Sequence, residues 1–105
     1  MTKVVFFGDN SSLCGFELSG HSTASQKDVE GKIVCSAVSS AAYMAVNTIT
    51  DVIGDSVDSL VDEGYMKIVV KDPSSASKDV LAGFKLHISE LSKQYQTRIT
   101  TFTEV

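Results

Sequence analysis

IVCSAVSSAAYMAVNTITDVIG (residues 33–54) repeats apolar side chains at helical spacing, and this long run predicts the helix that determines the fold class. Gly54 follows and can adopt the left-handed conformation that ends a helix. Small residues are unusually frequent, so a sheet, a second helix or a second copy of the chain can approach closely. The predicted buried stripe comprises Val34, Ala37 with Val38, Ala41, Ala45, Ile49 and Val52.

Short β-type runs lie on both sides of this helix. Residues 3–7 and the alternating residues 13–19 are joined by turn-forming residues 8–12, which predicts a hairpin. The alternation directs Cys14, Phe16 and Leu18 towards the core. Residues 22–32 show no period and predict an exposed loop.

The second half of the chain predicts another helix between two strands. Residues 65–70 form a strand that ends before Pro73, and residues 98–103 form a last strand. We interpret residues 55–64 as an acidic connector with a helical turn around Val57, Leu60 and Val61. Ser75 or Ser77 is the expected N-cap of the second helix. The second apolar stripe comprises Val80, Phe84, Ile88, Leu91 and Tyr95.

The resulting order is β-β-α-β-α-β, which predicts an α+β fold. We expect a two-layer sandwich in which a four-stranded, largely antiparallel sheet packs against two helices. A length of 105 residues fits a single domain, residues 1–105, with its own core.

Composition narrows the function class. The formal charge of −4 and nine scattered basic residues argue against nucleic acid as a direct partner. The apolar run after Met1-Thr2-Lys3 is too short for a signal peptide, and we expect no membrane-spanning run. We therefore expect a cytoplasmic protein in which Cys14 and Cys35 are reduced. Two Cys and two His spread over the chain do not predict a metal site.

Cys35 and His21 are the candidate catalytic residues. With a helix starting near Ile33, Cys35 falls in its first turn, where unpaired amides favour a thiolate and could hold an oxyanion. His21 lies 14 residues earlier at a strand end, within folding reach. Ser39 follows Cys35 by one turn, and Gly20 could bend the backbone beside His21. The structural alternative is a packed cysteine and a surface histidine.

These residues also carry a family resemblance. Gly15-Phe16-Glu17-Leu18-Ser19-Gly20-His21, followed by Ile33-Val34-Cys35-Ser36-Ala37-Val38-Ser39, resembles the paired signature of the ribosomal-processing cysteine proteases. Asn47, the pair Gly64-Tyr65 and the helix before Tyr95 are similar too.

The resemblance implies a catalytic pair and a substrate. Cys35 would be the nucleophile, His21 its base, and Ser39 and Gly20 supporting residues. The implied task is removal of an N-terminal extension from a bacterial large-subunit ribosomal protein, next to paired Phe residues. The resemblance also implies a homodimer that needs no metal or organic cofactor.

The chain departs from the family pattern in two places. Lys32 stands where the family usually has Asp, and the chain has about two extra residues between His21 and Cys35. We expect Asp28 or Glu30, from the longer loop, to replace the missing Asp in helix capping or histidine orientation.

Two other functions remain open on the sequence. One is a non-catalytic dimeric interaction module near the ribosome, with Cys35 packed in its helix. The other, a redox or metal-binding thiol protein, is disfavoured because the chain has no C-x-x-C motif. His87 lies beside the second apolar stripe, and we interpret it as a solvated or subunit-edge residue.

Overall fold

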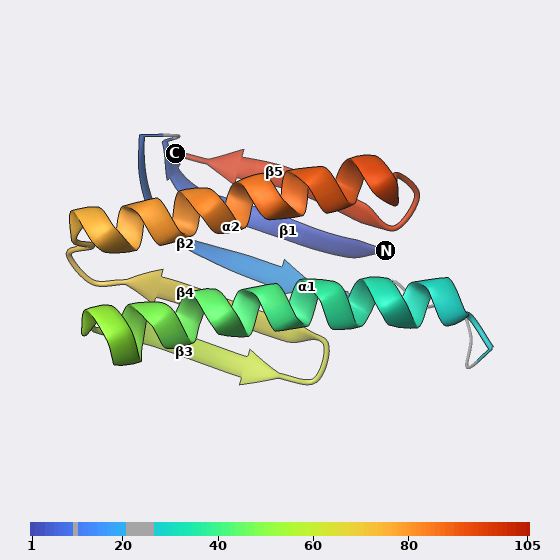
Figure 1. Cartoon of the computed structure of the whole chain (residues 1–105), viewed down its shortest axis with the longest axis horizontal. Coiled ribbons are helices and arrows are strands. Elements are labelled where there is room, and N and C mark those ends of the chain that lie inside the picture. The colour runs from blue at the N-terminus through green and yellow to red at the C-terminus, as the bar shows by residue number, and fades with distance from the viewer. Residues whose placement is uncertain (10, 21–26) are drawn as a thin grey trace.

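The computed structural model describes residues 1–9, 11–20 and 27–105. Five strands form one sheet in the order β3-β4-β2-β1-β5, and helices α1 and α2 lie side by side over the same face of it (Figure 1). The α+β class with two helices on a sheet is confirmed. The elements are β1 (Thr2–Asp9), β2 (Ser12–Ser19), α1 (Val29–Asn47), the π-helical turn η1 (Thr48–Ile53), β3 (Val57–Asp62), β4 (Tyr65–Val70), α2 (Ser75–Gln94) and β5 (Ile99–Glu104).

The prediction of four strands is wrong, because residues 57–62 form a strand and not a connector. β3 pairs antiparallel with β4 through a tight turn in which Gly64 has a φ of 68°. β3 lies at one edge of the sheet, and all its residues after Val57 are exposed. An edge strand that is exposed on both faces has no alternation of apolar and polar residues, so its sequence resembled a loop.

The sheet is mixed, which also corrects the expectation of a largely antiparallel sheet. β1 pairs antiparallel with β2 but parallel with β5, from Thr2 opposite Ile99 to Phe7 opposite Glu104. A parallel neighbour requires a crossover connection, and α2 supplies the helix of the connection from β4 to β5. This topology places the start of β5 beside the start of β1.

The predicted hairpin is confirmed, but a β-bulge changes the direction of Cys14. Phe7 pairs with Gly15 and Gly8 pairs with Leu13, so Cys14 is an extra residue in β2. The bulge reverses the alternation, and Leu13 is buried together with Phe16. Cys14 is only half-buried, and the prediction that it faces the core is wrong.

The core lies between the sheet and the two helices. The Phe84 ring of α2 lies 4.6 Å from the Phe16 ring and 5.8 Å from the Phe6 ring, between centroids. The predicted stripe of α1 is buried at Val34, Val38, Ala45 and Ile49, and that of α2 at Phe84 and Ile88.

The stripe of α1 ends earlier than predicted. Val52 is 79% exposed, because η1 winds more widely than an α-helix and takes this residue out of phase. Gly54 ends the helix in the left-handed conformation, with a φ of 91°, as predicted.

The stretch Val29–Ile53 also departs from the expectation that no apolar run approaches membrane-spanning length. The stretch is 25 residues long and contains an 18-residue window with a mean hydropathy of 1.4, so by length and composition alone it could cross a membrane. Core helices of soluble proteins meet the same criteria, and Val34 and Val38 of this helix are buried in the core. Because only 28% of this 18-residue window is buried, much of its apolar surface is exposed on the helix layer.

Asp55 joins the end of the first helical segment to the start of α2. Its carboxylate accepts hydrogen bonds from the Ser77 hydroxyl (2.5 Å) and from the Ser74 backbone N–H and hydroxyl (2.9 and 2.8 Å). Ser74 is the N-cap of α2, where Ser75 or Ser77 was predicted. Ser77 is buried, and its bond to Asp55 satisfies a hydroxyl that would otherwise lack a partner in the core.

Candidate active site

Cys35 lies in the second turn of α1, so the prediction that it occupies the first turn is wrong. The helix begins at Val29, six residues before Cys35, because Asp28 is a better N-cap than Lys32. The Asp28 carboxylate accepts a hydrogen bond from the Gly31 N–H at 3.0 Å. Residues 29–32, predicted as loop, are therefore helical, and the field of the helix terminus is weaker at Cys35 than expected.

The amides one turn before Cys35 already have acceptors. The Gly31 N–H donates to the Asp28 side chain, and the Lys32 N–H donates to the Asp28 carbonyl at 3.1 Å. A helical side chain leans towards the preceding turn, so these are the amides closest to the sulfur on its own helix. The expectation that unpaired first-turn amides would form an oxyanion hole is therefore wrong for the Gly31 and Lys32 amides.

A cavity of about 260 Å³ opens beside Cys35. It brings together three of the predicted site residues, Cys35, Ser39 and Gly20, from two elements that are distant in the sequence. Its walls are formed by α1, the end of β2, the start of β1 and the β3–β4 hairpin. The lining residues are Thr2, Leu18, Gly20, Cys35, Val38, Ser39, Tyr43, Val61, Asp62, Gly64, Tyr65 and Met66.

The backbone at Gly20 is held in a conformation that favours glycine. Its φ is 86°, and a Cβ built there would lie 2.5 Å from the Met1 carbonyl oxygen. The Gly20 N–H donates to the Gly64 carbonyl at 3.1 Å, which ties the end of β2 to the β3–β4 turn. The predicted bend at Gly20 is thus present, at the edge of the cavity.

Glu17 and Tyr65 form a pair that sequence reasoning missed. The Tyr65 hydroxyl donates to the Glu17 carboxylate at 2.5 Å. This hydrogen bond, reinforced by partial burial, raises the pKa of Tyr65 above its ordinary value. The two residues lie on adjacent strands, β2 and β4, and only the strand register brings them together. The pair holds the Tyr65 side chain in place. Tyr65 is the neighbour of Gly64, whose carbonyl accepts the hydrogen bond from Gly20.

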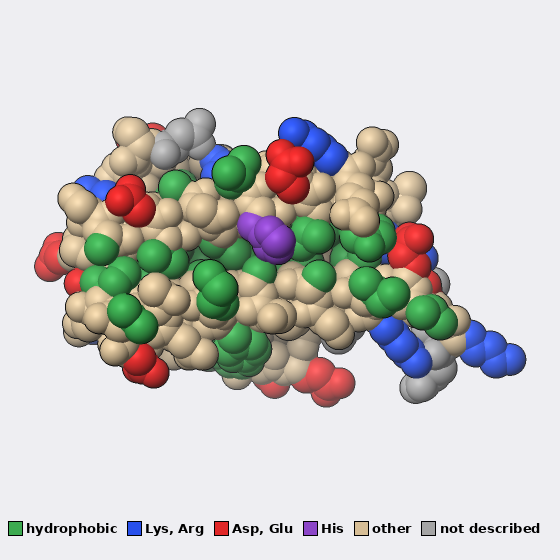
Figure 2. Space-filling view, viewed as in Figure 1, with side chains coloured by type: hydrophobic (Ala, Val, Ile, Leu, Met, Phe, Trp, Pro, Cys, Tyr) green, Lys and Arg blue, Asp and Glu red, His purple; other side chains and the backbone are tan. Residues whose placement is uncertain are grey.

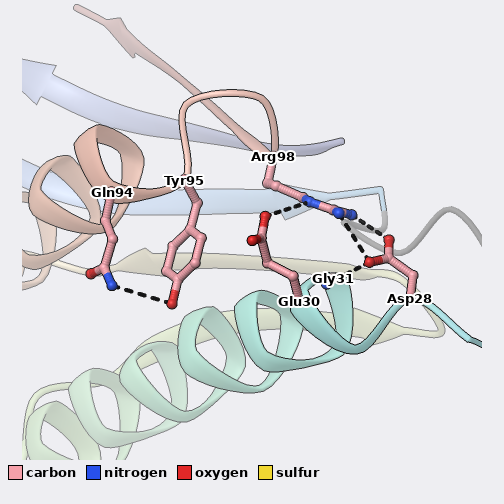
Figure 3. A network of polar contacts seen from close by, with 6 residues as sticks. All are labelled: Asp28, Glu30, Gly31, Gln94, Tyr95 and Arg98. Atoms are coloured by element: carbon pink, nitrogen blue, oxygen red, sulfur yellow. Dashed lines mark hydrogen bonds and ion pairs between the residues drawn. The ribbon is translucent and has the colours of Figure 1, made fainter.

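Asp28 and Glu30 do not line the cavity beside Cys35; both contact Arg98 (Figure 3). The Arg98 guanidinium contacts both oxygens of Asp28, with one bond at 2.9 Å, and reaches Glu30 at 3.3 Å. Asp28 caps α1, so the expectation that it could provide the cap is confirmed. Sequence reasoning missed Arg98, since its partners lie about 70 residues away along the chain.

Other candidate residues are outside the described part or far from the cavity. His21 lies outside the described residues, so its role as base stays a prediction. Lys32 is exposed, and Asn47 is the exposed last residue of α1, three turns beyond Cys35. Cys14 and Cys35 carry thiols and no disulfide. Within residues 1–9, 11–20 and 27–105, no cluster of three or more His, Cys, Asp or Glu could hold a metal ion.

The sequence and the fold of the chain were compared with those of known proteins. Among curated proteins, no sequence matches the chain. The solved structure of SMU.848 from Streptococcus mutans is 25% identical, with a TM-score of 0.86 over 99% of this chain and 94% of that protein.

The ribosomal processing protease Prp of Staphylococcus aureus has the same fold. Two structures, one with a substrate peptide and one with a covalently linked product peptide, are each 18% identical, with a TM-score of 0.86 over 99% of this chain and 100% of theirs. The model of the family described as cysteine protease Prp matches residues 1–100. Because this match spans nearly the whole chain, the chain belongs to the cysteine protease Prp family.

Proposed function

We propose that this protease removes the N-terminal extension of a bacterial large-subunit ribosomal protein. The observation that carries the proposal is the family match over residues 1–100, together with a cavity that contains Cys35 and Ser39. The S. aureus relative is a ribosomal processing protease that binds a substrate peptide. The net charge of −4 suits a basic ribosomal substrate.

Cys35 is the nucleophile in this mechanism and His21 is the base. His21 takes the thiol proton, and the sulfur attacks the peptide carbonyl carbon to form a tetrahedral intermediate. Collapse of the intermediate breaks the C–N bond, and His21 returns the proton to the leaving amine. Water, activated by the same imidazole, then hydrolyses the thioester and restores the thiol. Each step conserves its protons, so no cofactor enters.

The cavity beside Cys35 suits an apolar side chain of the peptide. Leu18, Val38 and Met66 are buried residues that contribute apolar surface, and Val61 and Tyr43 lie at its exposed margin. Paired Phe residues near the cleaved bond would satisfy such a site, because apolar walls with a few polar groups favour aromatic side chains. Ser39 supplies a hydroxyl on the same helix face, one turn after Cys35.

We place the protein in the cytoplasm, as a homodimer that pairs through its helix face. No charged residue occurs in α1 and η1 between Lys32 and Asp51, although Ile33 is 53% and Met44 69% exposed. A groove of about 710 Å³ runs between the helices and includes Met44, Gly83 and His87. Figure 2 shows hydrophobic side chains gathered along this face. An uncharged, apolar surface of this kind is typical of an interface.

Cleavage of a synthetic precursor peptide tests the proposed activity. The peptide carries an N-terminal extension with paired Phe, and mass spectrometry follows the products. We expect the native chain and a Cys14→Ser variant to cleave at one site, and Cys35→Ala to leave the peptide intact. Cleavage by Cys35→Ala would exclude Cys35 as the nucleophile, and no cleavage by the native chain would contradict the proposed activity on this peptide.

Thiol reactivity separates the protease from a non-catalytic module. An activated Cys35 should react quickly with iodoacetamide at neutral pH, with the modified peptide located by mass spectrometry. A Cys35 packed as a structural residue should react slowly, like Cys14 in the same sample.

A further inference from the structure

Two anchors hold the ends of the segment between β2 and α1. At its start, Gly20 donates to the Gly64 carbonyl and lies against Met1. At its end, Asp28 is held by Arg98 and caps α1 (Figure 3). The first anchor, at Gly20, lies at the cavity. The second anchor is the ion pair in which Arg98, near the end of the sequence, holds Asp28. The mechanism proposed for Cys35 and His21 does not use this second anchor.

Arg98 is the only arginine of the chain. Its ion pair with Asp28 is largely shielded from solvent. The Arg98 side chain is 22% exposed and the Asp28 side chain 12%. By contrast, the ion pair between Lys71 and Asp58 is 59% and 69% exposed. A guanidinium that contacts both carboxylate oxygens fixes the direction as well as the distance of its partner, which a lysine cannot do.

The backbone of Arg98 is itself fixed next to the cavity. Its N–H donates to the Tyr95 carbonyl at 2.9 Å, and its carbonyl accepts from the Thr2 N–H at 2.8 Å. Thr2 is buried and lines the cavity that contains Cys35. Arg98 therefore connects the sheet beside the cavity to the cap of the helix that carries the sulfur.

We propose that Arg98 is a positioning residue that fixes the start of α1, and with it the Cys35 sulfur, relative to the strand end that precedes His21. The proposal rests on the function proposed above for Cys35 and His21. Cys35 follows Asp28 by seven residues along one continuous helix, a rise of about 10 Å. A helix transmits a displacement of its cap to that distance, and reacting groups tolerate little misplacement.

The ion pair between Arg98 and Asp28, called the clamp below, has a cation that stays charged. The hydrogen bonds to Asp28, reinforced by the charges of Asp28 and Glu30, raise the pKa of Arg98 above its already high ordinary value. The guanidinium therefore stays charged over the ordinary pH range and remains available to the Asp28 carboxylate.

The test compares Arg98→Gln and Asp28→Asn with the control Lys71→Gln, which removes an exposed ion pair elsewhere. For each variant, circular dichroism verifies folding, and steady-state cleavage of the precursor peptide gives kcat and KM separately. We expect Arg98→Gln and Asp28→Asn to lower kcat roughly 10- to 100-fold with little change in KM. The double variant should lose no more than Arg98→Gln alone, because both substitutions remove the contact between Arg98 and Asp28.

Arg98→Lys keeps the charge but cannot contact both oxygens of Asp28 at once. We expect its kcat to lie between those of Arg98→Gln and the native chain. If Arg98→Gln fails to fold, Arg98→Lys decides in the same assay. Folded Arg98→Gln or Arg98→Lys with unchanged kcat, or a loss confined to thermal stability, would overturn the proposal.

The alkylation rate of Cys35 distinguishes failure of the clamp from failure of the proposed function. If the native chain does not cleave the peptide, the function proposed above is wrong for that substrate. The rate of Cys35 alkylation at neutral pH still reports the environment of the sulfur. A rate altered in Arg98→Gln but not in Lys71→Gln supports the clamp, and equal rates in both overturn it.

Discussion

Gly20 shows how one residue at the cavity combines two structural constraints. Its φ of 86° disfavours any side chain, and a Cβ would also lie 2.5 Å from the Met1 carbonyl oxygen. Gly54 has a similar φ of 91° but has nothing within 4 Å of its Cβ position. A side chain at Gly54 would meet backbone strain alone, whereas one at Gly20 would meet both backbone strain and a steric clash.

We predict that Gly20→Ala lowers stability more than Gly54→Ala. Strain alone should cost about 1–2 kcal/mol in each variant, and Gly20→Ala adds the clash with Met1. Thermal unfolding of both variants measures the difference. Equal losses in the two variants would mean that the start of β1 moves aside without cost.

Leu81 is fully buried in the core, although the predicted stripe of α2 did not include it. We predict that Leu81→Ala destabilises the protein by about 2–5 kcal/mol, because a cavity remains where the side chain packed. Leu86→Ala, on the exposed side of the same helix, should change stability by about 0.5 kcal/mol or less. Urea unfolding of the two variants checks both values, and similar midpoints would contradict the burial of Leu81.

The sequence predicted some site residues better than others for a physical reason. Cys35 and Ser39 lie one helical turn apart, and Gly20 precedes a motif residue, so local spacing was enough to select them. Arg98 and Tyr65 act through partners on other elements, which only the strand register and the crossover bring near. The helix start was misplaced because residues 29–32 show no apolar period, although Asp28, the cap, is of a residue type that favours a helix start.

At the scale of elements, Asp55 controls how α2 begins. Hydrogen bonds from Ser77, and then from Ser74, lower the pKa of Asp55 below its ordinary value of 3.8, while burial opposes them. The folded state therefore holds the ionised carboxylate more strongly than the unfolded chain does. Its stabilising contribution is complete above the unfolded pKa and is lost as the pH falls through the lower, folded value.

We predict that the Asp55 contribution disappears in acid. Asp55→Asn should be less stable than the native chain at pH 6, and the difference should shrink as the pH falls below 3.8. Urea unfolding at several pH values measures this difference. Asp51→Asn, which changes an exposed carboxylate in η1, serves as the control. A difference that is independent of pH would show that Asp55 acts by shape and not by charge.

Elements with one buried face were predictable, and those without one were not. The two helices, β2 and β4 have apolar residues at a regular period, which burial against the core imposes, whereas β1 is a continuous apolar run and β5 is Thr-rich with only its first residue buried. β3 has no buried face, so no period marks it, and only pairing with β4 makes it a strand. The bulge at Cys14 depends on the register of β1 with β2, which the alternation of one strand does not contain.

At the scale of the whole molecule, the sheet buries one face of α1 and leaves another exposed. The inner residues Val34, Val38 and Ala45 pack on the sheet, whereas Ile33 and Met44 are exposed. Small residues between them, such as Ala37, line the groove beside α2. A second copy of the chain could approach this surface closely, because small side chains bring backbones near and no charge needs to be desolvated.

We predict that Met44→Asp dissociates the proposed homodimer, because it places a charge in the centre of the uncharged helix face. Sedimentation equilibrium of the native chain should give a dimer, and Met44→Asp a folded monomer. Leu60→Asp is the matched control, since Leu60 is 61% exposed, close to the 69% of Met44, but lies on the edge strand β3. It should remain a dimer. A monomeric native chain would contradict the proposed homodimer, and dissociation by Leu60→Asp alone would place the interface at the β3 edge and not on the helix face.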